Sequence, residues 1–212
     1  MSYDGSTRNV SDVIRNTKRQ FGDESNVQIT NTDIIRWIND AQREIAGQLR
    51  HLKGRAVMNL VPGTSAYVYP IENIVQVDAL ILDGKTLPFM NFMDAREIID
   101  KNSEDATGKP DFYYAWGKEL MFYPAPVEPH VVEMYFARFP QDITSETDPL
   151  SIPDKNYDSL IDYVLAKAYE LDEDNDAARN LRSTFAARLL EQTDEEQNMQ
   201  NSLYPSITIL EE

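Results

Sequence analysis

Residues 108–126, GKPDFYYAWGKELMFYPAP, hold six aromatic residues among nineteen, and prolines stand near both ends. Side chains alternate between two faces before and after the Trp-Gly-Lys-Glu corner at 116–119, as they do in a β-strand. The pattern predicts a two-stranded hairpin with two apolar faces. Each face therefore needs a cover, which is the protein core, a layer of helices or a neighbouring subunit.

Four aromatic residues of this hairpin are candidates for contact between subunits: Tyr113, Trp116, Phe122 and Tyr123. A second interpretation is a glycan-binding module that uses the aromatic hairpin 108–126. Stacking of nucleic-acid bases is disfavoured, because such platforms interleave aromatic with basic residues and only Lys109 and Lys118 lie nearby.

Two helices are expected before the β-rich part of the chain. Residues 11–21 place apolar side chains at helical spacing between Ser11, a suitable N-cap, and Gly22, a suitable helix end. Residues 30–50 begin with capping oxygens and carry one apolar stripe, which consists of Ile34, Ile38, Ala41, Ile45 and Leu49. We expect this stripe to lie in the core.

From residue 55 to residue 140 the pattern changes to short extended runs. Pro62-Gly63 and Asp83-Gly84 are turn dipeptides, and the second is a strong hairpin signal. Residues 91–103 favour a short helix. Together these segments predict about six short strands, mostly antiparallel, interrupted by one helix.

After Pro140 the helical spacing returns in two segments that an acidic run between residues 172 and 176 separates. Pro153 next to Asp154 suits the start of the first. The loop between the two helices is short, so we expect antiparallel neighbours. The final residues, NSLYPSITILEE, read as an extended arm that could add as an edge strand to a partner sheet.

These segments predict an α+β fold. Its expected parts are an antiparallel helical bundle, made of the N-terminal and C-terminal helix pairs, an inserted small antiparallel β region and an extended C-terminal arm. The expected boundaries are 1–54 for the N-terminal helices, 55–140 for the β-rich insertion with its short helix, 141–199 for the C-terminal helix pair and 200–212 for the arm.

The net charge of −16 lies mainly in the second part of the chain. Residues 1–55 contain nine Lys/Arg and seven Asp/Glu, whereas residues 56–212 contain eleven and twenty-nine. Such a surface repels nucleic-acid phosphates and favours solubility and basic partners. The chain has no run of eighteen apolar residues, so we expect no membrane span, and its N-terminus lacks the apolar stretch of a signal peptide.

The sequence offers little for catalysis or metal binding. The absence of cysteine excludes disulfides, thiolate metal sites and cysteine nucleophiles. Phosphate-binding loops and the Gly-x-Ser-x-Gly elbow are missing. His51 and His130 stand far apart and are expected to be ordinary surface histidines. We therefore expect no catalytic residue, no cofactor and no metal.

Acidic residues form pairs that could suit a carboxylate hydrolase: Asp94 with Glu97, Asp158 with Asp162, and Glu170 with Asp174. Thirty-six acidic residues produce such pairs by chance, so a hydrolase is only a third interpretation. Asp174 and Asp176 lack the glycine and the final glutamate of a calcium loop, and we expect a solvated helix junction there.

Three stretches carry a resemblance when taken in their order along the chain. They are ITNTDIIRWINDAQREIA (29–46), the aromatic hairpin (108–126) and SIPDKNYDSLIDYVLAKAYELDEDNDAA (151–178), which continues to FAARLLE (185–191). Their combination resembles the head-to-tail adaptor proteins, also called head-completion or neck connector proteins, of tailed bacteriophages. The similarity spans about residues 10–195, and we see no match after Met199.

The resemblance implies a structural protein of the virion neck with no catalytic residues. Such adaptors form a homo-oligomeric ring, usually of twelve copies, between the portal protein and the tail tube, nozzle or tail-completion protein. Double-stranded DNA passes through the ring without sequence-specific binding, and assembly takes place in the host cytoplasm without a membrane. An extended terminal arm often grips the portal, and here its candidate residues are Tyr204, Ile207, Ile209 and Leu210.

Overall fold

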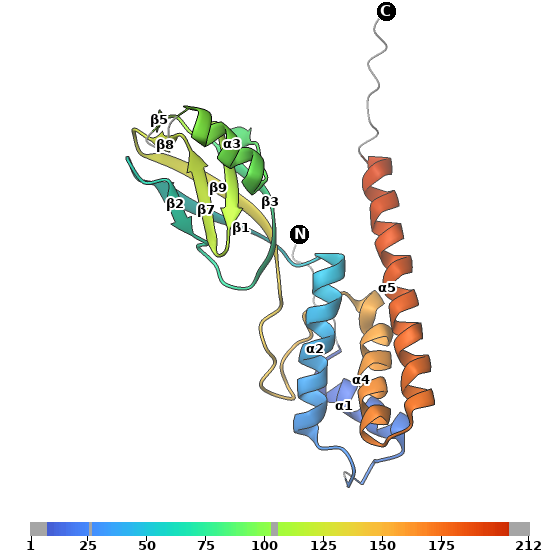
Figure 1. Cartoon of the computed structure of the whole chain (residues 1–212). Coiled ribbons are helices and arrows are strands. Elements are labelled where there is room, and N and C mark those ends of the chain that lie inside the picture. Colours follow the sequence, from blue (N-terminus) through green and yellow to red (C-terminus); the bar gives the residue numbers. More distant parts are fainter. Residues whose placement is uncertain (1–7, 26, 103–105, 204–212) are drawn as a thin grey trace, which may run out of the picture. The chain divides into compact units, whose positions relative to one another are not determined.

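The computed structural model describes residues 8–25, 27–102 and 106–203, with side chains through Asp194. This part of the chain contains five α-helices and nine β-strands, and all sheet pairings but one are antiparallel. The chain divides into two compact units (Figure 1). We call residues 1–51 with 139–212 the helical unit and residues 52–138 the β unit.

Four helices of the helical unit share one apolar core: α1 (Val10–Phe21), α2 (Asn31–Leu49), α4 (Tyr157–Leu171) and α5 (Asn175–Leu203). In Figure 1, α2, α4 and α5 run side by side. The stripe expected on α2 is buried along its whole length, from Ile34 to Leu49. A short 3-10 turn (Asp154–Asn156) follows Pro153 and leads into α4.

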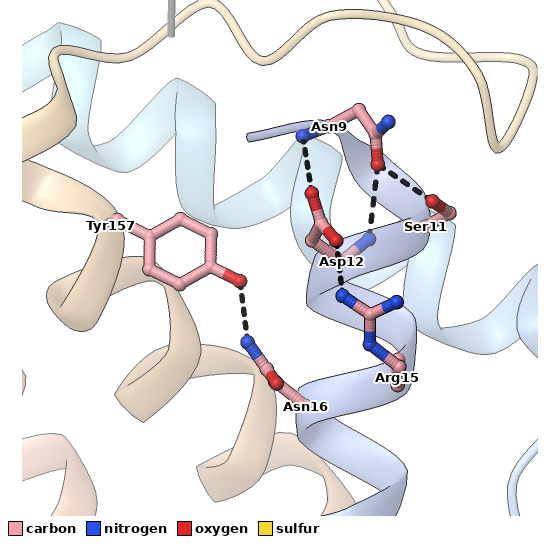
Figure 2. A network of polar contacts seen from close by, with 6 residues as sticks. All are labelled: Asn9, Ser11, Asp12, Arg15, Asn16 and Tyr157. Carbon is pink, nitrogen blue, oxygen red and sulfur yellow. Dashed lines mark hydrogen bonds and ion pairs between the residues drawn. The ribbon is translucent and has the colours of Figure 1, made fainter. Parts of the chain in front are cut away.

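Helix α1 begins earlier than the sequence suggests, because its N-cap is Asn9 and not Ser11. The Asn9 carboxamide oxygen accepts from the Asp12 backbone N–H (3.1 Å), and Asp12 Oδ2 accepts from the Asn9 backbone N–H (3.2 Å). This reciprocal capping box satisfies two backbone donors that the first turn leaves unpaired. Figure 2 shows that Ser11 only supports the cap, since its hydroxyl donates to Asn9 Oδ1.

A separate hydrogen bond beside this network joins α1 to α4. Asp12 accepts from Arg15 at 2.5 Å, and one turn further the Asn16 amide donates to the hydroxyl of Tyr157 at 2.8 Å (Figure 2). Tyr157 is the first residue of α4, which lies far along the chain. The hydrogen bond therefore fixes α1 against the start of α4.

The segment after the β unit returns along α2 and is bound by α2 side chains. Asn39 accepts from the backbone N–H of Ile143 (2.8 Å) and donates to the Ile143 carbonyl (3.0 Å). Gln42, which is fully buried, accepts from the backbone N–H of Ser151 at 2.6 Å. These bonds satisfy backbone groups of an irregular segment that has no sheet or helix pairing, and so they hold this segment against α2 within the helical unit.

Helices α4 and α5 form an antiparallel pair. Glu170 binds Arg182, Asp162 binds Arg188, and the Asn156 amide donates a hydrogen bond to Gln192. In these three pairs the residue number falls along the first segment while it rises along the second. The two segments therefore run in opposite directions. Asp174 supports the junction, because its carboxylate accepts from the backbone N–H of Ala177 in the first turn of α5.

The loop between α1 and α2 is held by one buried carboxylate. Asp23 accepts hydrogen bonds from three successive backbone N–H groups, those of Val27 (2.8 Å), Gln28 (2.9 Å) and Ile29 (2.8 Å). These bonds, with Ile29 first, lower the pKa of Asp23 below its ordinary value of 3.8. The ionised side chain therefore fixes the conformation of the loop.

Asp23→Asn should destabilise the protein at neutral pH, because an amide presents its own N–H groups to backbone donors. A carboxyl whose pKa is lowered by folding contributes stability above its unfolded pKa, and this contribution is lost as the pH falls through the folded pKa. Urea denaturation between about pH 2 and 7 should therefore show a difference in the free energy of unfolding between the unchanged protein and Asp23→Asn, and this difference should disappear in acid. A difference of constant size would contradict this role.

The β unit contains a four-stranded antiparallel sheet in the order β1 (Lys53–Leu60), β9 (His130–Arg138), β3 (Ile74–Leu82) and β4 (Lys85–Leu87). The predicted hairpin signal Asp83-Gly84 joins β3 to β4, and both residues have positive φ (50° and 76°). That geometry matches the twist of the flanking strands. The central strand β9 comes last in sequence, so the sheet closes only when both ends of the β unit meet.

A second layer consists of a three-stranded antiparallel sheet in the order β2 (Ala66–Val68), β7 (Glu119–Tyr123) and β6 (Phe112–Trp116). The short pair β5 (Thr107–Gly108) and β8 (Ala125–Pro126) is parallel, unlike the antiparallel pairing expected for this region. Helix α3 (Phe92–Asn102) forms at the predicted place and packs on β6.

Candidate functional site

The aromatic hairpin is formed by β6 and β7, and both of its faces are covered inside the β unit. One face, with Tyr113 and Phe122 paired directly across the two strands, packs on the four-stranded sheet. The other face, with Phe112 paired to Tyr123, packs on α3 through Ala95. The hairpin is thus the middle layer between a sheet and a helix, which explains why both of its faces are apolar.

The four candidates for contact between subunits fall into two groups. Tyr113, Phe122 and Tyr123 are only 4%, 1% and 9% exposed, so they stabilise their own unit and offer little surface to another chain. Burial also raises the pKa of the Tyr113 hydroxyl. Trp116 is 60% exposed, and it is the residue of this group that the structure leaves available for a contact.

Trp116 stands at the tip of the hairpin in a defined orientation. Its indole stacks on the ring of Phe92 in α3, with centroids 4.2 Å apart and planes 28° apart. Gly117 follows with φ of 61°, as the first position of a two-residue hairpin turn requires, and Lys118 completes the turn with its side chain exposed. One face of the indole is therefore covered, while the rest faces outward beside a positive charge.

The glycan-binding interpretation depends on exposed ring faces, and the structure provides few. Five of the six aromatic residues of 108–126 are at most 9% exposed. A hollow of about 460 Å³ lies next to the hairpin, and Tyr114, Tyr123 and Arg96 contribute to its lining. Both tyrosine rings belong to the core against α3 and are only 6% and 9% exposed, so they offer little ring surface for stacking.

Five of the six paired acidic residues, all but Asp158, take part in helix caps or ion pairs that the structure shows. Glu170 accepts from Arg182 at 2.5 Å, and this bond lowers the pKa of Glu170. Asp162 contacts Arg188 at 2.8 Å, yet burial raises the pKa of Asp162 because desolvation outweighs the nearby guanidinium. Glu97 pairs with Lys101. Each contact belongs to the helices themselves, which is a sufficient structural reason for these acids.

The histidines differ from the sequence expectation. His130 is not a surface residue: it is 7% exposed at the start of β9, with Nδ1 3.4 Å from Asp83 Oδ2. Lys109 also binds Asp83 at 2.8 Å and is the main reason that the pKa of Asp83 is lowered. His51 is half-buried, and its Nε2 lies 3.0 Å from the carbonyl of Ser151. Both rings thus hold chain segments in place, a role that single-sequence spacing does not reveal.

Two further features concern the described residues alone. Among 8–25, 27–102 and 106–203 no three His, Asp or Glu side chains gather as a metal site would require. In the same residues no helix is both long and apolar enough to cross a bilayer. The arm residues Tyr204, Ile207, Ile209 and Leu210 lie outside the described part, and α5 continues through Leu203, beyond residue 200 where we expected the arm to begin.

The acidic character is concentrated in the helical unit. Its residues 1–51 and 139–212 contain twelve Lys/Arg and twenty-four Asp/Glu, and those of the β unit contain eight and twelve. The molecule therefore combines a strongly acidic helical unit with a β unit that exposes Trp116 and Lys118.

A family model described as SU10 adaptor protein matches residues 8–206. The chain belongs to this family of phage head-to-tail adaptors. The match extends further than the resemblance seen in the sequence, since it continues past Met199 and includes Tyr204. No curated protein sequence matches the adaptor significantly. Membership makes the adaptor a structural component of a bacteriophage virion.

Proposed function

We propose that this adaptor forms a ring between the portal and the tail tube, nozzle or tail-completion protein of a tailed phage. The observation that carries the proposal is the family match over residues 8–206, which spans both units. In this proposal the antiparallel helical bundle and the inserted β unit form one subunit of a homo-oligomer of twelve copies. The adaptor occupies the virion neck, assembles in the host cytoplasm and performs no catalysis.

The charge of the adaptor supports a role as a conduit. A channel wall that binds phosphates would retain the genome, whereas an acidic wall repels it and lets double-stranded DNA move. The excess of twelve acidic residues in the helical unit is consistent with placing that unit around the channel. The DNA then passes without sequence-specific contacts.

The ring is tested by mixing purified adaptor with the portal protein of the same phage. Cryo-electron microscopy of the complex should show a rotationally symmetric collar of adaptor copies bound to the portal. A monomeric state of the purified adaptor without portal is not decisive, because assembly can begin on the portal. An adaptor that stays monomeric with portal and tail proteins present would overturn the proposal.

We further propose that the C-terminal residues grip the portal through Tyr204 and Ile207. Tyr204→Ala combined with Ile207→Ala should weaken portal binding and leave the melting temperature nearly unchanged, because the double change leaves every described core residue in place. Pull-down with immobilised portal measures the first quantity and thermal denaturation the second. Undiminished binding would assign portal contact to another element.

A further inference from the structure

We propose that the hairpin tip of one copy, Trp116 with Lys118, inserts into a hollow on the helical unit of the neighbouring copy. The inference rests on the ring proposed above and names the two surfaces that meet in it. A ring needs heterologous contacts, in which one patch of a subunit meets a different patch of the next. The hairpin tip on the β unit and the hollow on the helical unit provide such a pair of different patches.

The hollow lies where the α1–α2 loop meets the end of α4, and its volume is about 230 Å³. Its lining consists of Phe21, Gln28, Ile29, Ala168, Leu171 and Asp172. Pockets for drug-sized ligands measure roughly 300–1,000 Å³, so this one suits a single large side chain better. Leu171 in this lining is 58% exposed, and Val27, which precedes Gln28 in the sequence, is 80% exposed. The hollow therefore offers an apolar surface that a partner side chain would cover.

The walls of the hollow are held in place. Asp23 binds the backbone of Gln28 and Ile29, which form one wall. Phe21 packs edge-on against Tyr169 of α4, with centroids 5.2 Å apart, and so fixes the opposite side. A preformed site loses little conformational entropy on binding, which favours association.

The rim of the hollow is acidic. Asp172 lines it, and Glu173 and Asp174 follow in the exposed loop between α4 and α5. The best partner is thus an apolar group with a cation beside it.

The hairpin tip meets both requirements. Trp116 supplies an exposed indole whose stacking on Phe92 holds its orientation. Lys118 in the turn supplies the cation, while the exposed Glu119 stands opposite Trp116 on β7. Tryptophan is also enriched among the residues that dominate binding energy in protein interfaces. Insertion would bury the free part of the indole and bring Lys118 to Asp172.

The larger hollow in the β unit is a poorer receptor. Among the described residues, its lining contains no acidic side chain that would attract Lys118, and it includes Arg96, already paired with Asp100, and the polar side chains of Ser65 and Thr107. Charge therefore favours the hollow on the helical unit. A second copy fits as the partner, because each copy carries both the hairpin tip and the hollow on the helical unit.

Disulfide trapping tests the contact directly, because the adaptor contains no cysteine. Lys118→Cys and Asp172→Cys are made in separate chains, mixed, assembled with portal and oxidised. We expect covalent dimers that contain one chain of each kind, because disulfides require Cα atoms within roughly 7 Å. A chain with both changes should give a ladder of linked subunits. Ser183→Cys, an exposed position on α5, replaces Asp172→Cys in the control mixture and should give no dimer.

Charge reversal tests the chemistry of the rim. Lys118→Glu should raise the adaptor concentration needed for ring formation at least tenfold. Adding Asp172→Lys in the same chain should bring this concentration most of the way back to that of the unchanged protein. Trp116→Ala should raise that concentration about thirtyfold or more, as expected for a dominant interface residue. Circular dichroism confirms that each variant is folded.

The outcomes separate this inference from the proposed function. A ring on the portal that gives no covalent dimer between the Lys118→Cys and Asp172→Cys chains leaves the ring intact and overturns the contact. Disulfides formed only within single chains that carry both changes also overturn it, because the hairpin tip and the hollow would then meet inside one copy. Failure to form any ring overturns both.

Discussion

Phe122→Ala is expected to lower the free energy of unfolding of the β unit by about 3–5 kcal/mol. Phe122 is 1% exposed in the middle layer, where its ring meets Tyr67 edge-on at 5.6 Å between centroids and lies 6.5 Å from the ring of Tyr113. Removing it leaves a cavity lined by side chains from both sheets, and rigid strands cannot close such a cavity fully. The cost therefore exceeds the loss of apolar burial alone.

The two tryptophans let each unit report its own unfolding. Trp37 is buried in the helical unit and Trp116 lies in the β unit, so Trp37→Phe and Trp116→Phe backgrounds give one fluorescent reporter each. In urea, Phe122→Ala should move the Trp116 transition to lower concentration and leave the Trp37 transition in place. Equal shifts of both transitions would show that the two cores unfold as one, contrary to this expectation.

Phe89→Ala is the matched control for this measurement. Phe89 is the same residue type in the same unit, but it is 60% exposed and contacts Tyr113 edge-on at 5.4 Å. Its removal loses at most one aromatic contact, worth about 0.5–1.5 kcal/mol. A Phe89→Ala effect as large as that of Phe122→Ala would mean that burial is not what sets the cost.

Local patterns in the sequence predict the elements of this fold well. The stripe from Ile34 to Leu49 becomes the buried face of α2, because a spacing of three and four residues places side chains on one side of a helix. Asp83-Gly84 forms the expected hairpin because both residues adopt positive φ at low cost. These features depend only on neighbours along the chain, so a single sequence contains them.

Features that depend on distant residues could not be predicted in the same way. Alternation in 108–126 shows that the hairpin has two apolar faces, but it does not show what covers them. In the structure, three of the four residues expected at a subunit interface are buried against α3 and the larger sheet. His130 is buried because β9 occupies the centre of a sheet that three other strands complete. The Asn39–Ile143 hydrogen bonds join positions about one hundred residues apart.

The candidate site shows the same division. The aromatic tip at Trp116 was recognisable from its turn residues, while the hollow that we propose as its receptor combines Phe21, Ile29 and Leu171 from three separate segments. No spacing rule connects these positions, since the α1–α2 loop meets the end of α4 only in the folded unit. Composition does predict the acidic rim, because the residues around Asp172 follow one another in sequence.

Leu189→Ala is expected to destabilise the helical unit by about 2–5 kcal/mol. Leu189 is fully buried in the core of the four helices, whereas Leu190, its neighbour on α5, is 64% exposed. Leu190→Ala removes the same atoms from the same helix and should change stability by no more than about 0.5 kcal/mol. Trp37 fluorescence in urea measures both variants. If the two substitutions had similar effects, the orientation of α5 against α4 described here would be wrong, because one residue of rotation exchanges the two side chains between core and solvent.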